Sequence, residues 1–399
     1  MANQPGSFIY MDHAATTAVH PEVLEAMLPY FSEEFYNPSS MYAPAQRCRQ
    51  AVDAARKTIA DLLGALPPEI IFTSGGTESD NAAIRGIATA LRPQGNHIIT
   101  STAEHHAVLH TCHAMEKLGF AVTYLPVDRY GMVKAGDAEK AIKRETVLIS
   151  LMLANNEVGT INPVAEIAAI AKAKAKSLKT HIAVHTDAVQ CPGHLDITVD
   201  RLGVDALSLS SHKFNGPKGA GILYLRKDTP FEPYQAGGSH ERNRRAGTEN
   251  VPGIVGTAAA LKIAIEERSS NVEQTKALRD RLIGGIQKRI PGAHLNGHPV
   301  ERLPSNVNFS FERTDSQWTL MALDEAGIGA STGSACRTAS LEPSHVLVAC
   351  GIPANLAIGT LRLTLGPENT AAEVDKVLAI LPGIIQRVRD TAPPAEAKA

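Results

Sequence analysis

An amine and a carboxylate stand at the ends of two short apolar runs of this chain. Lys213 follows the run at residues 204–210, and Asp187 ends the run at residues 182–187. If the two runs are neighbouring strands, both groups emerge at one edge of a sheet. The pair fits pyridoxal phosphate, whose aldehyde needs a lysine Schiff base and whose ring nitrogen needs a carboxylate. Alone the pair is weak evidence, because most such residues are solvated turn residues or helix caps.

A glycine-rich turn adds a phosphate site to this pair. The apolar run at residues 70–73 leads into Gly75, Gly76 and Thr77, and a helical pattern follows over residues 82–87. Glycines let the main chain approach a ligand closely. Unpaired amides at a helix start, together with the helix dipole, favour an anion. The turn therefore predicts that a phosphate group binds at the start of this helix.

Cys336 is the second chemical centre. It lies in a run of small residues at 329–340 that has no strand or helix period, which predicts an exposed, mobile loop. The neighbouring Arg337 favours the thiolate, because a nearby cation stabilises the charged form. Cys48 recurs with apolar residues at helical spacing, and Cys350 lies in an apolar run, so both are predicted to be core residues.

Composition limits the classes of function. The 399 residues carry a formal net charge of −2, and no run of Lys or Arg indicates direct contact with nucleic acid or an anionic membrane. No apolar stretch approaches the ~20 residues of a membrane span, and residues 1–6 lack a signal-peptide pattern. The five widely spaced cysteines indicate neither a disulfide framework nor a structural metal site. We therefore expect a cytoplasmic protein with small-molecule ligands.

The alternation of strand-like and helical runs predicts the fold. Seven strand-like runs occupy residues 70–73, 97–101, 121–127, 147–153, 181–187, 204–210 and 221–225. This alternation is typical of an α/β domain with a mostly parallel seven-stranded sheet. A long helical stretch from residue 251 to 290, followed by strands near residues 306–311 and 359–365, predicts a second, smaller α/β domain.

The complete set of motifs resembles the cysteine desulfurases, pyridoxal-phosphate enzymes of the nitrogenase-associated and iron–sulfur-assembly type. The resemblance covers nearly the whole chain, and its motifs follow in order at residues 10–17, 37–40, 73–79, 104–105, 154–159, 187–190, 208–213, 245–250, 333–336 and 341–344. It implies fold type I of the pyridoxal-phosphate-dependent transferases, within the class V aminotransferase superfamily. The expected division is an arm at residues 1–20 packed on the small domain, a large domain at 21–255, a small domain at 256–390 that carries the cysteine loop, and a disordered tail at 391–399.

The resemblance also implies a role for each matching residue at the cofactor. Lys213 matches the Schiff-base lysine, Asp187 the partner of the ring nitrogen, and Gln190 the donor to the ring oxygen. His105 matches the imidazole that stacks on the ring, and it could also help to deprotonate the substrate thiol. The matching phosphate ligands are Gly76, Thr77, Ser210, His212 and, from a second subunit, Thr248.

For the substrate, the resemblance implies that Asn156, which also belongs to the cofactor set, and Arg362 hold the carboxylate. Arg362 suits this role because its planar fork pairs bidentately with a carboxylate. Its alternation with leucines in residues 360–365 also fits a plain solvent-facing arginine on a strand. The Cys336 thiolate would attack the sulfur of bound L-cysteine, leaving L-alanine and a persulfide.

The implied partners are a second copy of the chain with shared active sites and a sulfur acceptor or iron–sulfur scaffold protein. The acceptor pathways are iron–sulfur cluster assembly and tRNA thiolation, and the only metal contact implied is ligation of a transferred cluster by Cys336. Two alternatives stay open. One is a selenocysteine lyase or another lyase or transaminase of this fold, and the other is a docking scaffold for sulfur-transfer proteins. The intact Lys213, Asp187 and Arg362 argue against a scaffold, which needs none of them.

Overall fold

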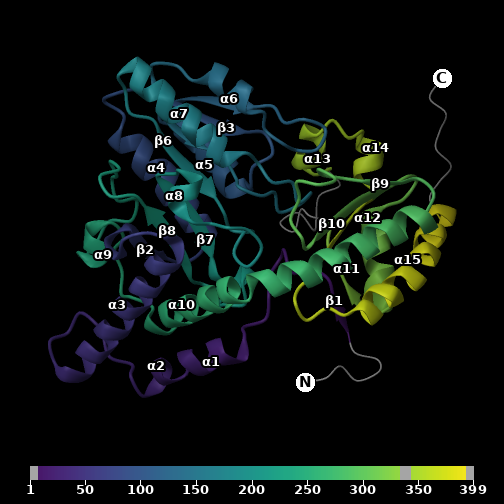
Figure 1. Cartoon of the computed structure of the whole chain (residues 1–399), viewed down its shortest axis with the longest axis horizontal. Helices are drawn as coiled ribbons and strands as arrows, with labels where there is room; N and C mark the ends of the chain where they lie inside the picture. Colours follow the sequence, from purple (N-terminus) through teal and green to yellow (C-terminus); the bar gives the residue numbers. More distant parts are fainter. Residues whose placement is uncertain (1–7, 333–342, 392–399) are drawn as a thin grey trace.

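The computed structural model describes residues 8–332 and 343–391 of the chain (Figure 1). Cys336 and most of the predicted tail, residues 392–399, lie outside the described residues. Figure 1 shows a large lobe built on one sheet and a smaller lobe, with the long helix α11 (Arg268–Arg289) leading from one to the other. The division into four segments expected from the sequence stays a prediction.

The large lobe confirms the mostly parallel seven-stranded sheet. Its strands are β2 (Ile70–Thr73), β3 (His97–Ser101), β4 (Ala121–Leu125), β5 (Thr146–Ser150), β6 (Ala183–Asp187), β7 (Ala206–Ser210) and β8 (Gly221–Leu225). They lie in the order β2-β8-β7-β6-β5-β3-β4. Only β8 runs antiparallel to its neighbours within this sheet.

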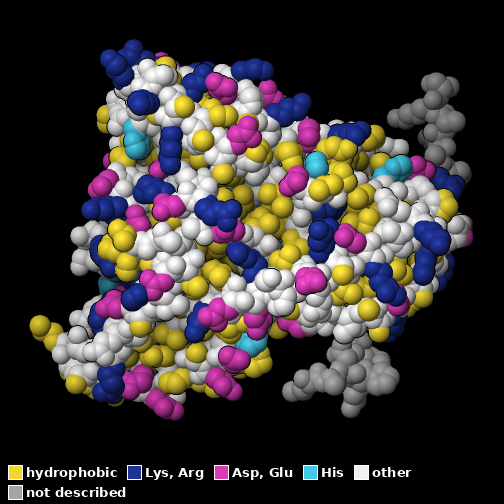
Figure 2. Space-filling view, viewed as in Figure 1, with side chains coloured by type: hydrophobic (Ala, Val, Ile, Leu, Met, Phe, Trp, Pro, Cys, Tyr) yellow, Lys and Arg dark blue, Asp and Glu magenta, His cyan; other side chains and the backbone are white. Residues whose placement is uncertain are grey.

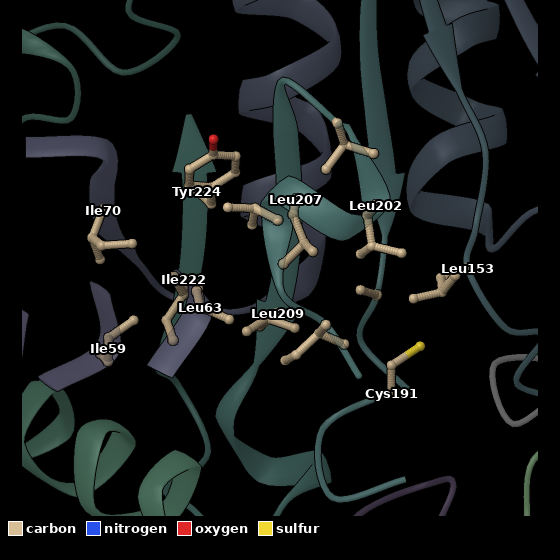
Figure 3. Packing of buried hydrophobic residues seen from close by; sticks show 14 of the residues in the cluster. Ile59, Leu63, Ile70, Leu153, Cys191, Leu202, Leu207, Leu209, Ile222 and Tyr224 are labelled. Atoms are coloured by element: carbon tan, nitrogen blue, oxygen red, sulfur yellow. The ribbon is translucent and has the colours of Figure 1, made fainter. Parts of the chain in front are cut away.

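Most strands of this sheet are buried along their whole length, because helices pack on both of its faces. Figure 3 shows part of this core, where side chains such as Leu207 and Ile222 of the strands meet Ile59 and Leu63 of α3 (Ala43–Leu63). The predicted spacing of α3 is confirmed, and Cys48 on this helix is fully buried. The helix ends at Gly64, whose φ of 68° lies in the left-handed region that glycine adopts without strain.

The remaining helices of the large lobe include short connecting turns. They are α1 (Pro21–Met27), α2 (Pro29–Ser32), η1 (Pro67–Glu69), α4 (Gly76–Ala90), α5 (His106–Lys117), α6 (Ala135–Ala141), α7 (Val164–Leu178), α8 (Val199–Leu202), η2 (Ser211–Lys213), α9 (His240–Asn243) and α10 (Val251–Glu266). No helix in the described ranges combines the length and the apolar character needed to cross a bilayer. Basic and acidic side chains are interspersed over the face seen in Figure 2.

The small lobe is the second α/β unit predicted from the sequence. Its three-stranded antiparallel sheet consists of β9 (Ala293–Leu295), β10 (Asn306–Phe311) and β12 (Thr360–Thr364). Helices α11 and α15 (Ala371–Thr391) bury apolar faces against this sheet. The other helices are α12 (Ser316–Glu325), α13 (His345–Ala349) and α14 (Ala354–Ala357).

The N-terminal segment packs on the small lobe. Strand β1 (Ile9–Tyr10) pairs in parallel with β11 (Ile328–Gly329), and Met11 is fully buried in the core of the small lobe. The backbone amide of Thr364 donates to the Met11 carbonyl at 2.8 Å. After these contacts the chain continues toward the large sheet, where the Thr17 amide donates to the His212 carbonyl at 2.9 Å.

A buried ion pair joins α3 to the short helix α9. The Arg56 guanidinium donates through both Nη atoms to the Glu241 carboxylate at 2.7 Å, and it also donates to the Ile70 carbonyl at 2.6 Å. Both side chains are almost fully buried. Glu241 adopts a φ of 46°, an unfavourable conformation for a residue other than glycine, so its contacts must hold it there.

We expect Glu241→Gln to lower thermal stability strongly, because it leaves the Arg56 charge buried without a counter-ion. Removing one partner of a buried pair typically costs about 3–5 kcal/mol. Thermal unfolding measured by circular dichroism checks this prediction. The matched control is Asp375→Asn, which breaks the exposed Arg281–Asp375 pair and should cost about 1 kcal/mol or less. Equal losses in the two variants would contradict the prediction.

Candidate active site

The predicted site residues converge on one cavity of about 300 Å³ at the edge of the large sheet. All of them line it except two: Thr248 does not line this cavity, and Cys336 lies outside the described residues. The predicted residues in the wall are Lys213, His105, Asp187, Gln190, Gly76, Thr77, Ser210, His212, Asn156 and Arg362. Thr248 is an exposed residue between α9 and α10.

The neighbouring parallel strands β6 and β7 place the amine and the carboxylate. Asp187 ends β6 and pairs in register with Ser208 of β7, and Lys213 follows in the turn η2. Parallel strands end at the same edge of a sheet, where ligands bind. The Lys213 Nζ donates to the Ala14 carbonyl at 2.6 Å and to the Ala15 carbonyl at 2.7 Å, so the N-terminal segment forms one wall of the site.

Asp187 is a buried carboxylate facing the cavity. Its Oδ1 accepts a hydrogen bond from the Val189 amide at 2.9 Å. Burial raises the pKa of Asp187 to about 6, against the lowering effects of the Val189 amide and the Lys213 charge. The group is therefore mostly ionised at pH 7 and above, and it suits a cationic ring nitrogen.

The start of α4 lies at the wall of the cavity and can hold an anionic group close to the main chain. A Cβ added at Gly76 would lie 2.7 Å from Val189 Cγ2, so only glycine allows this close approach. Thr77, Ser210 and His212 line the same end of the cavity. This end opens into a second hollow that is also lined by Lys218, a cation that the sequence interpretation missed although it lies in the turn after Lys213.

His105 caps α5 with its ring. The Nδ1 atom accepts a hydrogen bond from the Ala107 amide at 3.1 Å, so the proton of the neutral ring is on Nε2. Burial and, to a smaller extent, the Lys213 charge lower the pKa of His105 to about 4. The ring is therefore neutral at physiological pH, and a role as proton acceptor through Nε2 would require the other tautomer.

Arg362 lies in the small lobe but reaches into the cavity. It is 1% exposed, which excludes a solvent-facing strand arginine. One Nη donates to the Asn156 carbonyl at 2.9 Å and the other to Asp12 Oδ1 at 2.8 Å. Asp12 was not assigned a role from the sequence, although it belongs to the motif at residues 10–17. Its position shows that the N-terminal segment orients this guanidinium.

Other polar residues of the wall were also missed. Glu104 is fully buried, accepts hydrogen bonds from Ser101 Oγ at 2.6 Å and the Met152 amide at 2.9 Å, and has its pKa raised to about 8 by burial. His345 lies 2.9 Å from the Glu104 carbonyl through Nε2. Asp80 lines the cavity from α4. The sequence signal for Glu104 was its position directly before His105; Asp80 could have been found one helical turn after Gly76.

Comparisons with known proteins identify the family of the chain. The aminotransferase class-V family model matches residues 9–377. A protein named cysteine desulfurase IscS from Methanosarcina thermophila is 55% identical over 385 residues, which cover 96% of this chain and 94% of the relative. A protein of the same name from Dictyoglomus turgidum is 51% identical over 96% of both chains.

Solved structures of similar fold also include proteins of this kind. The structure of a NifS-like protein superposes with a TM-score of 0.89 at 39% identity, covering 95% of this chain and 100% of that chain. A structure titled SspA in complex with cysteine superposes with a TM-score of 0.80 at 37% identity, covering 91% and 100%. The chain therefore belongs to the aminotransferase class-V family and, within it, to the cysteine desulfurases.

Proposed function

We propose that this protein binds pyridoxal phosphate, converts L-cysteine to L-alanine and leaves the sulfur as a persulfide on Cys336. The observation that carries the proposal is the convergence of Lys213, Asp187, the cradle at Gly76 and Arg362 on one cavity. These groups offer an amine, a carboxylate, an anion site and a carboxylate-binding fork. The relatives named cysteine desulfurase and the solved complex with cysteine support the choice of substrate.

The residues present fit the cofactor. Lys213 would bond its aldehyde, Asp187 would face the ring nitrogen, and Gln190 and His105 would contact the ring. The phosphate would lie at the α4 start with Ser210 and His212. When bound, pyridoxal phosphate withdraws electrons from the substrate and so makes the Cα proton and the Cβ–S bond labile.

Some side chains of the cavity would bind the substrate, and others would transfer its proton or donate a hydrogen bond. The Arg362 fork would hold the substrate carboxylate, with Asn156 beside it, which fixes the direction of the Cα–H bond. The Lys213 amine would take the Cα proton. His105, with its proton on Nε2, would offer a hydrogen bond rather than accept a proton.

The assignment of Cys336 as nucleophile gains support from the other cysteines. The four cysteines within the described residues are all buried, namely Cys48, Cys112, Cys191 and Cys350. Burial raises the pKa of Cys112 and of Cys350 to about 12 and raises that of Cys191 well above its ordinary value. Thiols that stay protonated are poor nucleophiles, and Cys48 is fully buried and out of reach of a ligand, which leaves Cys336 as the candidate.

In the transfer step, the Cys336 thiolate forms an S–S bond with the substrate sulfur while the Cβ–S bond breaks. The electron pair of that bond stays with the substrate carbon, and a proton added at Cβ completes L-alanine. The sulfur is thereby oxidised to the persulfide level and the carbon is reduced, so no external oxidant is needed. A sulfur acceptor or scaffold protein, for cluster assembly or tRNA thiolation, would then take the persulfide sulfur.

We further propose a homodimer with shared active sites in the cytoplasm. Residues 28–42 expose large apolar side chains, among them Phe31 at 60%, Phe35 at 64% and Met41 at 95%. Such clusters mark interaction surfaces. The hollow at the phosphate end would admit Thr248 from a second subunit.

Alanine release from L-cysteine by the cofactor-loaded protein, with a thiol reductant present, tests the reaction. Cys336→Ala should lower the rate at least about a thousandfold, because the nucleophile is lost. The matched control Cys350→Ala should keep most of the activity, since this thiol is a core residue. Equal release by both variants, or release from L-selenocysteine by Cys336→Ala, would favour another lyase of this fold. No alanine from the wild type would favour the docking scaffold.

Arg362→Lys should raise KM for L-cysteine at least about tenfold while the cofactor absorbance is unchanged. The ammonium cannot form the two parallel hydrogen bonds of the guanidinium, and one bond to a charged group contributes about 1.5–3 kcal/mol. Steady-state kinetics at several substrate concentrations checks this. Arg302→Lys, which changes a buried arginine outside the cavity, should cost stability without raising KM. An unchanged KM in Arg362→Lys would remove Arg362 from substrate binding.

His105 should contribute no ionisation to the pH profile of turnover between pH 6 and 9. Its pKa is lowered to about 4, so it loses its proton well below this range and stays neutral throughout it. Turnover measured across this range should therefore show the same acid-limb midpoint in the wild type and in His105→Asn, a variant that keeps an N-cap acceptor. A midpoint near pH 6.5 that disappears in His105→Asn would show that this ring titrates during catalysis.

A further inference from the structure

Asp80 is a buried carboxyl group that the reaction above does not use. It lies on α4 one turn after Gly76, is 1% exposed and lines the active-site cavity. Its Oδ1 has no hydrogen-bond partner among the described residues. Buried polar atoms nearly always have a partner, so this one requires an explanation.

Among the residues that the structure describes, the basic side chain paired with Asp80 is His185, whose Nε2 lies 3.7 Å from Oδ1. The two ring nitrogens of His185 lie 2.9 Å from the hydroxyl oxygens of Ser150 and Ser208, and burial lowers the pKa of His185 to about 3. His185 is therefore neutral, and an ionised Asp80 would be an uncompensated buried anion.

Two further acidic groups, Asp187 and Glu104, lie near Asp80, together with the His105 ring and the Ser208 hydroxyl. An Asp80 oxygen, an Asp187 oxygen and a His105 nitrogen lie within 4.8 Å of one another. Burial, then the charge of Asp187 and, to a smaller extent, that of Glu104 raise the pKa of Asp80 well above its usual range, against the lowering effect of a hydrogen bond with the Ser208 side chain. Two adjacent buried carboxyl groups do not both ionise.

Of the two carboxyl groups, Asp187 is the one whose ionised form is better stabilised. It accepts the Val189 amide hydrogen bond and is stabilised by the Lys213 ammonium, and Asp80 has neither contact. The proton therefore belongs on Asp80. A gap of at most 4.8 Å to Asp187 is short enough for one water molecule to bridge.

We propose that Asp80 is a neutral carboxylic acid that directs its proton toward Asp187 and so positions the ionised Asp187 for the ring nitrogen of the cofactor. The role of Asp187 in this inference rests on the proposed function. A hydrogen bond to the charged form of a carboxylate favours that form. Asp80 is thus a positioning residue: it acts on the cofactor through Asp187, and it leaves the cavity with one negative charge at this point instead of two.

Infrared spectroscopy tests the protonation state without any activity measurement. The full-length protein, stripped of cofactor at pH 7, should show the carbonyl band of a buried protonated carboxylic acid, and Asp80→Asn should lose part of it. Glu104→Gln serves as the control that assigns the contribution of the second protonated acid. If Asp80→Asn removes no carboxylic-acid band, Asp80 is ionised and the proposal fails, whether or not the protein is a desulfurase.

Rescue by a conservative variant tests the action on Asp187. Asp80→Asn keeps a neutral donor of the same shape, so its dissociation constant for pyridoxal phosphate, followed by absorbance, should stay within about threefold of the wild type. Asp80→Leu keeps a neutral side chain but no donor, and the constant should rise about tenfold or more, the effect of one hydrogen bond to a charged group. Equal weakening in both variants would mean that the charge of Asp80 matters and would overturn the proposal; equal wild-type affinity in both would remove the link to Asp187.

Discussion

The buried guanidinium of Arg362 holds together three parts of the chain that lie far apart in sequence. It extends from β12 of the small lobe, binds Asp12 of the N-terminal segment and reaches the Asn156 carbonyl of the large lobe. A charge this deeply buried is tolerated only with such partners. The cavity between the lobes therefore depends on this contact, and the substrate carboxylate would enter a site where the fork is already oriented.

The large sheet fixes the positions of the carboxylate and the amine of the cavity. Strands β6 and β7 are parallel neighbours, so Asp187 and the turn with Lys213 emerge at the same edge. Helix α4 starts at that edge, where Gly76 lets the main chain pass close to Val189. The Lys213 amine binds two carbonyls of the N-terminal segment, so the arm that orients Arg362 also orients the lysine.

Burial is the main cause of the pKa shifts of the titratable groups in the cavity, and it decides which of them carry charge. Glu104, with its pKa raised to about 8, is mostly protonated at neutral pH, whereas Asp187, at about 6, is mostly ionised. His105 and His212 both have pKa values lowered to about 4 and are neutral. Several titratable groups thus line the site while few carry charge, which suits a cofactor whose chemistry depends on one cationic ring.

Local sequence determined the elements and the chemical types of this protein. The seven strands, the helical period of α3, the glycine turn at Gly76 and the pair of Lys213 and Asp187 are patterns of adjacent or regularly spaced residues, and the packing did not override them. The tertiary structure decided what depends on residues distant in sequence. It buried Arg362, which strand alternation alone leaves on either face, and it joined Asp12 to it across 350 positions. It also set the protonation of Asp80 and Glu104, because a pKa depends on burial and on neighbours that only folding brings together.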